Sequence, residues 1–495
     1  MKHILGVSAG FHDAAVAVIR DDGEIVFAGH SERYSKIKND PAIHPGLLKE
    51  CCEWDYEIVA FYERPWMHNL QQIRSGQHLF GPWTVSSALK QHLGEWYQRP
   101  AHREICYSHH LSHAAAGFQT SPFDRAAVVV IDAIGELDTI SIYRADYDDQ
   151  GRAHYQRVWR QGYPHSIGLF YSAVTQAVGL RPMEEEYITM GMAAYGSALG
   201  SSWMKQQFVD DIDTGRFKKN LHIGFDSGEL MFDNNEDIAA SAQALTEIMI
   251  DHIMHKARVL TGCDNVVYMG GVALNCVANS RILGRYFDRM WIMPNPGDSG
   301  SSLGAAALAH GKKLNWKNAF LGHDIPGPYP VKDLLDTLIK DKIAGVASGP
   351  AEFGPRALGN RSLLADPRGH DIKDRVNEIK RRQKFRPFAP VILEELVHEY
   401  FDLGPGWNHC RYMQSVAGCK FPDLYPAVCH VDGTSRVQTV PPDGSGIRQL
   451  LEQWYLLTGC PMLLNTSLNV RGEPMVNDRT DADRFERLYS VRVCS

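Results

Sequence analysis

The chain has 495 residues, of which 44% are hydrophobic and 22% charged, with a formal net charge of −7 and ten cysteines that form no C-x-x-C pair. This length exceeds one ordinary hydrophobic core, so we expect two or three domains of a soluble, cytoplasmic enzyme with reduced thiols. The composition excludes a disulfide scaffold, no apolar run approaches the ~18 residues of a membrane helix, and the acidic balance argues against a nucleic-acid partner.

The first residues predict a β-meander. An apolar strand at 4–7 is followed by a polar turn, a second strand at 14–19, a D-D-G hairpin signal and a third strand at 24–29. The turn between the first two strands carries His12, which we expect to face whatever lies above the sheet.

The pattern of an apolar strand followed by a glycine-bearing polar loop then recurs. Strands at 127–131 and 139–144 flank Asp132, a Gly270–Gly271 turn joins a strand to a helix, and a further such loop carries Asp298. In α/β folds, loops at the carboxyl ends of strands form the ligand crevice. Prolines and glycines cluster at 326–330, where we expect a linker between domains at 1–324 and 325–495.

The segment "CYSHHLSHAAAG" at 106–117 is a candidate metal site. With Ser108 as the helix N-cap, His109 and His113 share one face, whereas His110 points elsewhere. Two imidazoles on one face form half of a metal site, but histidines beside an alanine-rich helix also form ordinary local hydrogen bonds. Both interpretations stay open from this segment alone.

Two aspartates strengthen the metal interpretation. Asp132 ends the apolar strand "AAVVVID", where a buried carboxylate needs a partner, and Asp298 lies in the strand-to-helix loop "NPGDSGSSLG". Together with His109 and His113 they offer two nitrogen and two oxygen ligands. Such a set suits Fe(II), Zn(II) or Mn(II).

Candidate ligand-binding residues follow in both halves. The Gly270–Gly271 turn allows close backbone approach to a nucleotide, with Asn275 near a ribose or base, although a simple tight turn explains the glycines as well. The second half carries arginines, a lysine and amides at strand ends, which favour an anionic ligand. They include Arg356, Arg361, Lys380, Arg386, Asn465 and Ser467.

These motifs resemble the NodU/CmcH family of O-carbamoyltransferases. The matching segments run in family order from residue 5 to about residue 477, and the stretch 41–100 matches least. They are "GFHDAAVAV", "HHLSHAAAGF", "VVVIDAIGE", "SIGLFYSAVTQAVGL", "EEEYITMGMAAYG", "GGVALNCVAN", "PGDSGSSLGAAA", "EFGPRALGNRSLLADPR", "FRPFAPVILEE", "HVDGTSRVQTV" and "LNTSLNVRGEP".

The resemblance implies an α/β fold in two parts. The first would be an actin-like (ASKHA, duplicated RNase H-like) domain similar to the tRNA threonylcarbamoyl transferase, and the second a YrdC-like, open, twisted α/β domain. In such enzymes carbamoyl phosphate and ATP, with Mg²⁺, give carbamoyl-adenylate in the second domain. The first domain then passes the carbamoyl group to a hydroxyl of a small acceptor, such as a sugar, a nucleoside or a secondary metabolite.

The resemblance also assigns roles to residues. Catalysis falls to His12, Arg356 and Arg386, with His12 as general base. The metal, Fe(II) or else Zn or Mn, falls to His109, His113, Asp132 and Asp298. Binding of adenylate, ATP and carbamoyl phosphate falls to Gly270, Gly271, Asn275, Arg361, Lys380, Asn465 and Ser467.

Three other assignments are weighed against this one. A tRNA threonylcarbamoyl transferase shares the metal motif, but the net charge and the fused second domain argue against it. A hydrogenase-maturation carbamoyltransferase needs paired C-x-x-C zinc fingers and an acylphosphatase segment, which the sequence lacks. A non-catalytic nucleotide- and metal-binding regulator would not need site residues in both domains. The sequence leaves open the identity of the acceptor and whether the protein forms a homodimer.

Overall fold

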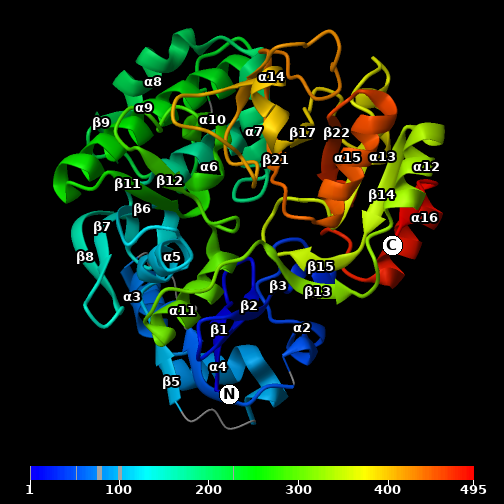
Figure 1. Ribbon diagram of the computed structural model, residues 1–495. Coiled ribbons are helices and arrows are strands. Elements are labelled where there is room, and N and C mark those ends of the chain that lie inside the picture. The colour runs from blue at the N-terminus through cyan, green and yellow to red at the C-terminus, as the bar shows by residue number, and fades with distance from the viewer. Residues whose placement is uncertain (1, 52, 75–80, 99–102, 227) are drawn as a thin grey trace.

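The computed structural model describes residues 2–51, 53–74, 81–98, 103–226 and 228–495 (Figure 1). Its first half begins with a five-stranded sheet in the order β3-β2-β1-β4-β5. β2 is antiparallel to β1 and β3, whereas β4 and β5 run parallel to β1. The strands are β1 (His3–Ser8), β2 (Ala15–Arg20), β3 (Ile25–His30), β4 (Tyr56–Phe61) and β5 (Arg103–Cys106).

A second five-stranded sheet repeats this arrangement, in the order β12-β11-β6-β7-β8. β7 is antiparallel to β6 and β8, whereas β11 and β12 run parallel to β6. The strands are β6 (Arg125–Gly135), β7 (Asp138–Tyr147), β8 (Ala153–Gly162), β11 (Asn265–Met269) and β12 (Arg289–Trp291). The two sheets share one strand order and one set of strand directions. This repeat confirms the predicted duplicated, actin-like α/β fold, including the N-terminal meander.

Both faces of the first sheet are covered, which explains the nearly continuous apolar sequence of β1. Leu5 and Val7 pack into one cluster with Leu47 of α2, whereas Ile4 packs into another with Ala114 of α5. The helices of this half are α1 (Glu32–Ser35), α2 (Pro45–Glu50), α3 (Pro65–Arg74), α4 (Val85–Leu93), α5 (His109–Phe118), α6 (Ile167–Ala177), α7 (Glu186–Met192), α8 (Ser201–Phe208), α9 (Asn235–Thr261), α10 (Cys276–Asn279) and α11 (Ser301–His310).

Helices α5 and α11 lie between the two sheets and touch each other (Figure 1). α11 packs on β1 and β2, and α5 packs on β6 and β11. The contact is close because both helices present small residues: a Cβ on Gly304 would lie only 1.8 Å from the carbonyl oxygen of Ser112. This approach brings the first turn of α5 next to the loop that precedes α11.

The second half is an open, mixed sheet in the order β21-β17-β22-β16-β14-β23 around one hydrophobic core (Figure 1). Its strands are β14 (Ile343–Ala347), β16 (Arg361–Ala365), β17 (Ala389–Leu393), β21 (Gln438–Val440), β22 (Met462–Ser467) and β23 (Val493–Cys494). Its helices are α12 (Val331–Asp341), α13 (Ile372–Ile379), α14 (Val397–Tyr400), α15 (Gly446–Thr458) and α16 (Arg479–Tyr489). This architecture agrees with the predicted open α/β sheet.

The predicted linker at 326–330 is a loop between β13 (Phe320–Ile325) and α12. However, β13 pairs antiparallel with β15 (Gly349–Glu352), which follows the linker. The two halves therefore share a small two-stranded sheet, and the domain boundary at 324 stays a prediction. Within the described ranges, no helix is long and apolar enough to cross a membrane.

We expect Gly304→Ala to lower the free energy of unfolding by about 1–3 kcal/mol, the usual cost of an added methyl group in a packed core. The two helices must separate to make room. Denaturation with urea, followed by circular dichroism, measures the change. Gly191→Ala in α7 is the matched control, because its Cβ would meet only Cδ of Pro387, at 3.8 Å. Equal stability of Gly304→Ala and wild type would contradict this role of the contact.

Candidate active site

Two histidine side chains at the start of α5 point toward each other. His109 and His113 lie with their Nε2 atoms 3.1 Å apart, so the predicted shared face is present. Ser108 occupies the N-cap position, although its side chain makes no capping hydrogen bond. His110 points away, with Nδ1 at 2.8 Å from Oγ of Ser141, which fits a structural role.

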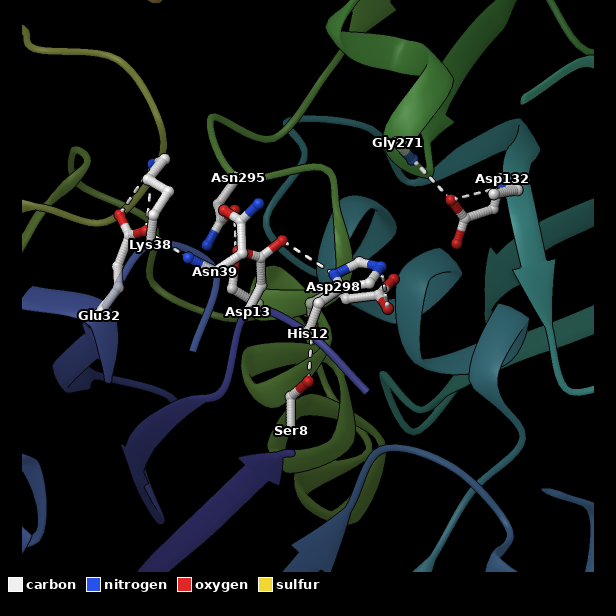
Figure 2. Close-up of polar contacts among 12 residues, drawn as sticks. Ser8, His12, Asp13, Glu32, Lys38, Asn39, Asp132, Gly271, Asn295 and Asp298 are labelled. Atoms are coloured by element: carbon white, nitrogen blue, oxygen red, sulfur yellow. Dashed lines mark hydrogen bonds and ion pairs between the residues drawn. The ribbon is translucent and has the colours of Figure 1, made fainter. Parts of the chain in front are cut away.

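Two carboxylates from other elements complete the cluster. Oδ2 of Asp132, in β6, lies 3.3 Å from Nε2 of each imidazole, and Oδ1 of Asp298, before α11, lies 3.2 Å from each. The other oxygen of Asp132 accepts hydrogen bonds from the backbone amides of Ala133 and Gly271 (Figure 2). The four predicted residues therefore form one buried group.

This group fits a divalent metal ion. Ligand atoms held about 2.0–2.1 Å from a shared ion lie ~3.0–3.4 Å from one another, as these donors do. Burial alone would raise the pKa of Asp132, but His109 and His113 lower it well below its usual value. Burial alone would lower the pKa of His109, but Asp298 and Asp132 raise it well above its usual value. The paired carboxylates thus demand positive charge, which a metal ion would supply.

Two neighbours of the cluster were not predicted. Oε2 of Glu63, just after β4, lies 3.5 Å from Nδ1 of His109. The main-chain oxygen of Tyr62 accepts a hydrogen bond of 2.7 Å from Ser112 of α5. The signal available in the sequence was a carboxylate directly after a buried strand, the position that singled out Asp132.

His12 stands between the cluster and open space. Its Nε2 lies 3.6 Å from Oδ2 of Asp298, and its Nδ1 lies 3.0 Å from Oδ2 of Asp13 (Figure 2). Burial would lower the pKa of His12, but Asp298 and Asp13 outweigh it and raise the pKa to about 9. The ring therefore lies at the end of the β1–β2 turn, as predicted, directly against a candidate metal ligand.

A single cavity of about 810 Å³ joins this region to the second half of the chain. Predicted site residues from both halves line it: His12, Asp132, Gly271, Asn275, Asp298, Arg356, Lys380, Arg386, Asn465 and Ser467. Segments more than 300 residues apart in sequence thus meet around one space.

The second half contributes a concentration of positive charge to the cavity. The cationic side chains that line it include Arg356, Lys380, Arg382, Arg386 and Arg436. Among the described residues, none of these five makes an ion pair with a carboxylate. Burial, followed by repulsion from Arg436, lowers the pKa of Arg356, and burial with repulsion from Arg382 lowers that of Lys380. Because cations crowded together in a partly buried site are unfavourable alone, the arrangement favours an anionic ligand.

Lys380 also organises the end of β22. Its Nζ donates to the main-chain oxygen and Oγ of Ser467, and to Oδ1 and the main-chain oxygen of Asn469, the last two at 2.9 Å. Nearby Asn465 donates to Ala357, while its own Oδ1 is buried without a partner among the described residues. An unpaired acceptor beside the cations is consistent with a ligand that carries both anionic oxygens and a donor group.

Arg361 is placed apart from the other cations of the second half. Its side chain is fully buried and does not line the cavity. The guanidinium donates to backbone carbonyls of Asn477, Ser348, Gly349, Asn360 and His323. With its donors occupied by the chain itself, Arg361 holds β13, β15 and the C-terminal segment together, and its role in ligand binding stays a prediction.

The Gly270–Gly271 loop makes contacts within the chain that the sequence did not indicate. Gly270 has φ +91°, and a Cβ there would lie 2.2 Å from the carbonyl oxygen of Ile131, so the close approach is to β6. Gly271 donates its amide to the Asp132 carboxylate, and the side chain of Asn275 caps α10 and exchanges two hydrogen bonds of 3.0 Å with Gln243. Contact of this loop with an adenylate stays a prediction.

Arg382 is a cavity residue that the sequence analysis missed. Its guanidinium donates to Oδ1 of Asn377 at 2.7 Å and lies over the ring of Phe388. The only signal was its place in the run "KRRQK", which is typical of a solvated surface.

Comparison with known proteins identifies relatives over most of the chain. A family model described as "Carbamoyltransferase N-terminus" matches residues 82–307, and one described as "Carbamoyltransferase C-terminus" matches residues 335–493. "Uncharacterized protein sll1178" of Synechocystis sp. is 32% identical, covering 98% of this chain and 94% of that protein. "Nodulation protein NolO" of Bradyrhizobium diazoefficiens is 32% identical over 76% of this chain and 75% of its own. "Nodulation protein U" of Rhizobium tropici is 28% identical over 97% and 93%.

Among solved structures, HypF of T. kodakarensis is 13% identical, with a TM-score of 0.39 over 62% of this chain and 47% of that chain. A likeness at this level adds nothing to what the strand order shows about the fold.

We expect His113→Gln to weaken metal binding at least about tenfold, since it removes a ligand from the cluster. His110→Gln, a change to the neighbouring histidine outside the cluster, should leave binding intact. Metal content after dialysis, measured by plasma mass spectrometry, and competition with a chelator give the two affinities. Equal metal content in both variants and wild type would exclude a metal site at these four residues.

Proposed function

Because the chain belongs to the carbamoyltransferase family, we propose that it is an ATP-dependent O-carbamoyltransferase acting in two steps within one cavity. In the first step carbamoyl phosphate, ATP and water give carbamoyl-adenylate, phosphate and pyrophosphate. In the second step the carbamoyl group passes to a hydroxyl of a small acceptor, such as a sugar, a nucleoside or a secondary metabolite. The observation that carries the proposal is the continuous cavity between the cationic residues and the His/Asp cluster.

The cationic residues support the first step. Carbamoyl phosphate and ATP are both anions, and Mg²⁺ accompanies the ATP phosphates in reactions of this kind. Arg356 and Arg386 line the cavity without carboxylate partners among the described residues, and Arg386 lies over the ring of Tyr187, so both guanidinium groups can pair with phosphate oxygens. Such preorganised charges hold the reacting groups in line and stabilise the charge that develops on the departing phosphates.

His12 supports the second step. The hydroxyl oxygen of the acceptor bonds to the carbamoyl carbon, its proton passes to Nε2 of His12 in its unprotonated form, and the bond from that carbon to the phosphate oxygen breaks, so that AMP leaves with the electron pair. Because the pKa of His12 is raised to about 9, chiefly by Asp298, this form predominates only in alkaline solution or where a bound metal ion would offset the charge of Asp298. An Fe(II), Zn or Mn ion held by His109, His113, Asp132 and Asp298 would supply Lewis-acid stabilisation of charge next to this position. Passage within one cavity keeps the reactive adenylate away from bulk water.

Arg356→Ala should reduce carbamoyl-phosphate-dependent exchange of pyrophosphate into ATP by about 10²–10³-fold, the usual cost of one preorganised donor at developing charge. Exchange of radiolabelled pyrophosphate measures this first step without any acceptor. Arg484→Ala, on the exposed face of α16, removes a cation from the same half without touching the cavity. Unchanged exchange in Arg356→Ala would assign another role to this loop.

His12→Gln should slow AMP release in the presence of glycerol, used as a hydroxyl probe, by about 10²–10⁴-fold, while pyrophosphate exchange continues. The reason is that only the second step needs a proton acceptor at this place. His154→Gln, on exposed strand β8, serves as the control. Loss of both activities in His12→Gln would contradict the division into two steps.

A further inference from the structure

Asp13 is the nearest polar neighbour of His12 and has no assigned role. Its Oδ2 lies 3.0 Å from Nδ1 of the imidazole, on the side of the ring away from Asp298 (Figure 2). Within the described chain, no lysine or arginine lies within ion-pairing distance of Asp13. Its carboxylate is therefore directed to the one ring beside it.

The backbone explains how two residues adjacent in sequence bond through their side chains. In an extended strand neighbouring side chains point to opposite faces. Asp13 instead has φ +55°, in the left-handed region that aspartate and asparagine enter more readily than most residues. This turn of the chain brings the carboxylate round to the imidazole.

A second loop holds this geometry in place. The amide of Asp13 donates to the carbonyl of Asn39 at 3.4 Å, that of Ala14 to Asp40 at 2.8 Å, and that of Gly10 to Pro41 at 2.9 Å. Backbone bonds thus fix the chain on both sides of His12. The ring itself, whose side chain is 26% exposed, is held on its Nδ1 side by Asp13.

We propose that Asp13 is a positioning residue, which accepts the Nδ1–H of His12 and thereby holds Nε2 on the side of Asp298, at the cavity wall, where the acceptor hydroxyl would bind. This inference rests on the second step of the function proposed above. The two nitrogens of imidazole are distinct, and a hydrogen bond at one decides which of them is offered to a substrate. Without the carboxylate, the ring can flip or adopt the other tautomer, in which Nε2 carries a proton and cannot accept one.

The test separates the carboxylate from the backbone turn. Asp13→Gly keeps the left-handed conformation and removes the side chain, whereas Asp13→Asn keeps both the conformation and an accepting oxygen. For AMP release with glycerol as probe, we expect Asp13→Gly to lower kcat about 10²-fold or more with little change in the KM for glycerol. Asp13→Asn should restore much of the rate. Asp149→Gly, in an exposed turn after β7, is the control.

A double variant shows whether Asp13 acts through His12. If it does, His12→Gln with Asp13→Gly should be no slower than His12→Gln alone, because the effects of residues acting as a unit do not add. Pyrophosphate exchange and metal content should equal those of wild type in every Asp13 variant.

Each other outcome overturns the inference in its own way. Asp13→Gly as fast as Asp149→Gly would show that the carboxylate is dispensable. A raised KM with unchanged kcat would assign Asp13 to acceptor binding, and lost exchange or lost metal would indicate a merely structural role. If wild type itself releases no AMP above the enzyme-free rate although exchange proceeds, the proposed second step fails, and the role of Asp13 in it fails too. Absence of both activities from wild type would instead reject the proposed function as a whole.

Discussion

The contact between helices α5 and α11 is the constraint on which the first half of the molecule depends. Each helix packs on a different sheet of the duplicated fold. Because Gly304 has no side chain, the two helix backbones come into direct contact there. His113 and Asp298, 185 positions apart in sequence, come within 3.2 Å as a result. Asp132 reaches the same point from β6, whose end is held by the amide of Gly271. Packing of small residues therefore decides whether the four side chains of the candidate metal site meet.

Electrostatics divides the cavity into two complementary parts. Near α5, two buried carboxylates favour binding of a cation, as the raised pKa of His109 and the lowered pKa of Asp132 both show. In the second half, crowded and partly or fully buried cations have no carboxylate partners among the described residues, and burial with repulsion between them lowers the pKa of Arg356 and Lys380. These cations favour binding of an anion. Both parts follow one rule, that a buried charge needs a partner. A ligand with anionic phosphate oxygens satisfies the second part directly.

The sequence predicted those features that local spacing determines. Two histidines four residues apart share a face on any helix, and a polar residue at a strand end meets others at the same edge, so the cluster could be inferred before the fold was known. Arg361 and Arg382 show where this reasoning ends. Both are arginines near glycine, proline or other cations. Arg361 donates its hydrogen bonds to backbone carbonyls that the pairing of β13 with β15 brings together, whereas Arg382 faces the cavity. A guanidinium can serve either purpose, and only tertiary contacts decide which.

The junction between the halves explains why the cavity is continuous. β13 and β15 pair across the loop that the sequence marks as a linker, and Arg33 of α1 donates to the carbonyl of Gly354 at 3.2 Å. The segment after α1 then supplies Lys38 and Asn39 to the cavity wall, and its carbonyls hold the turn that carries His12. Because the same short segment contacts the second half and fixes the turn that carries His12, the two steps proposed for this chain depend on one arrangement of its halves. A junction of this kind suits chemistry in which an unstable intermediate must reach its acceptor before water does.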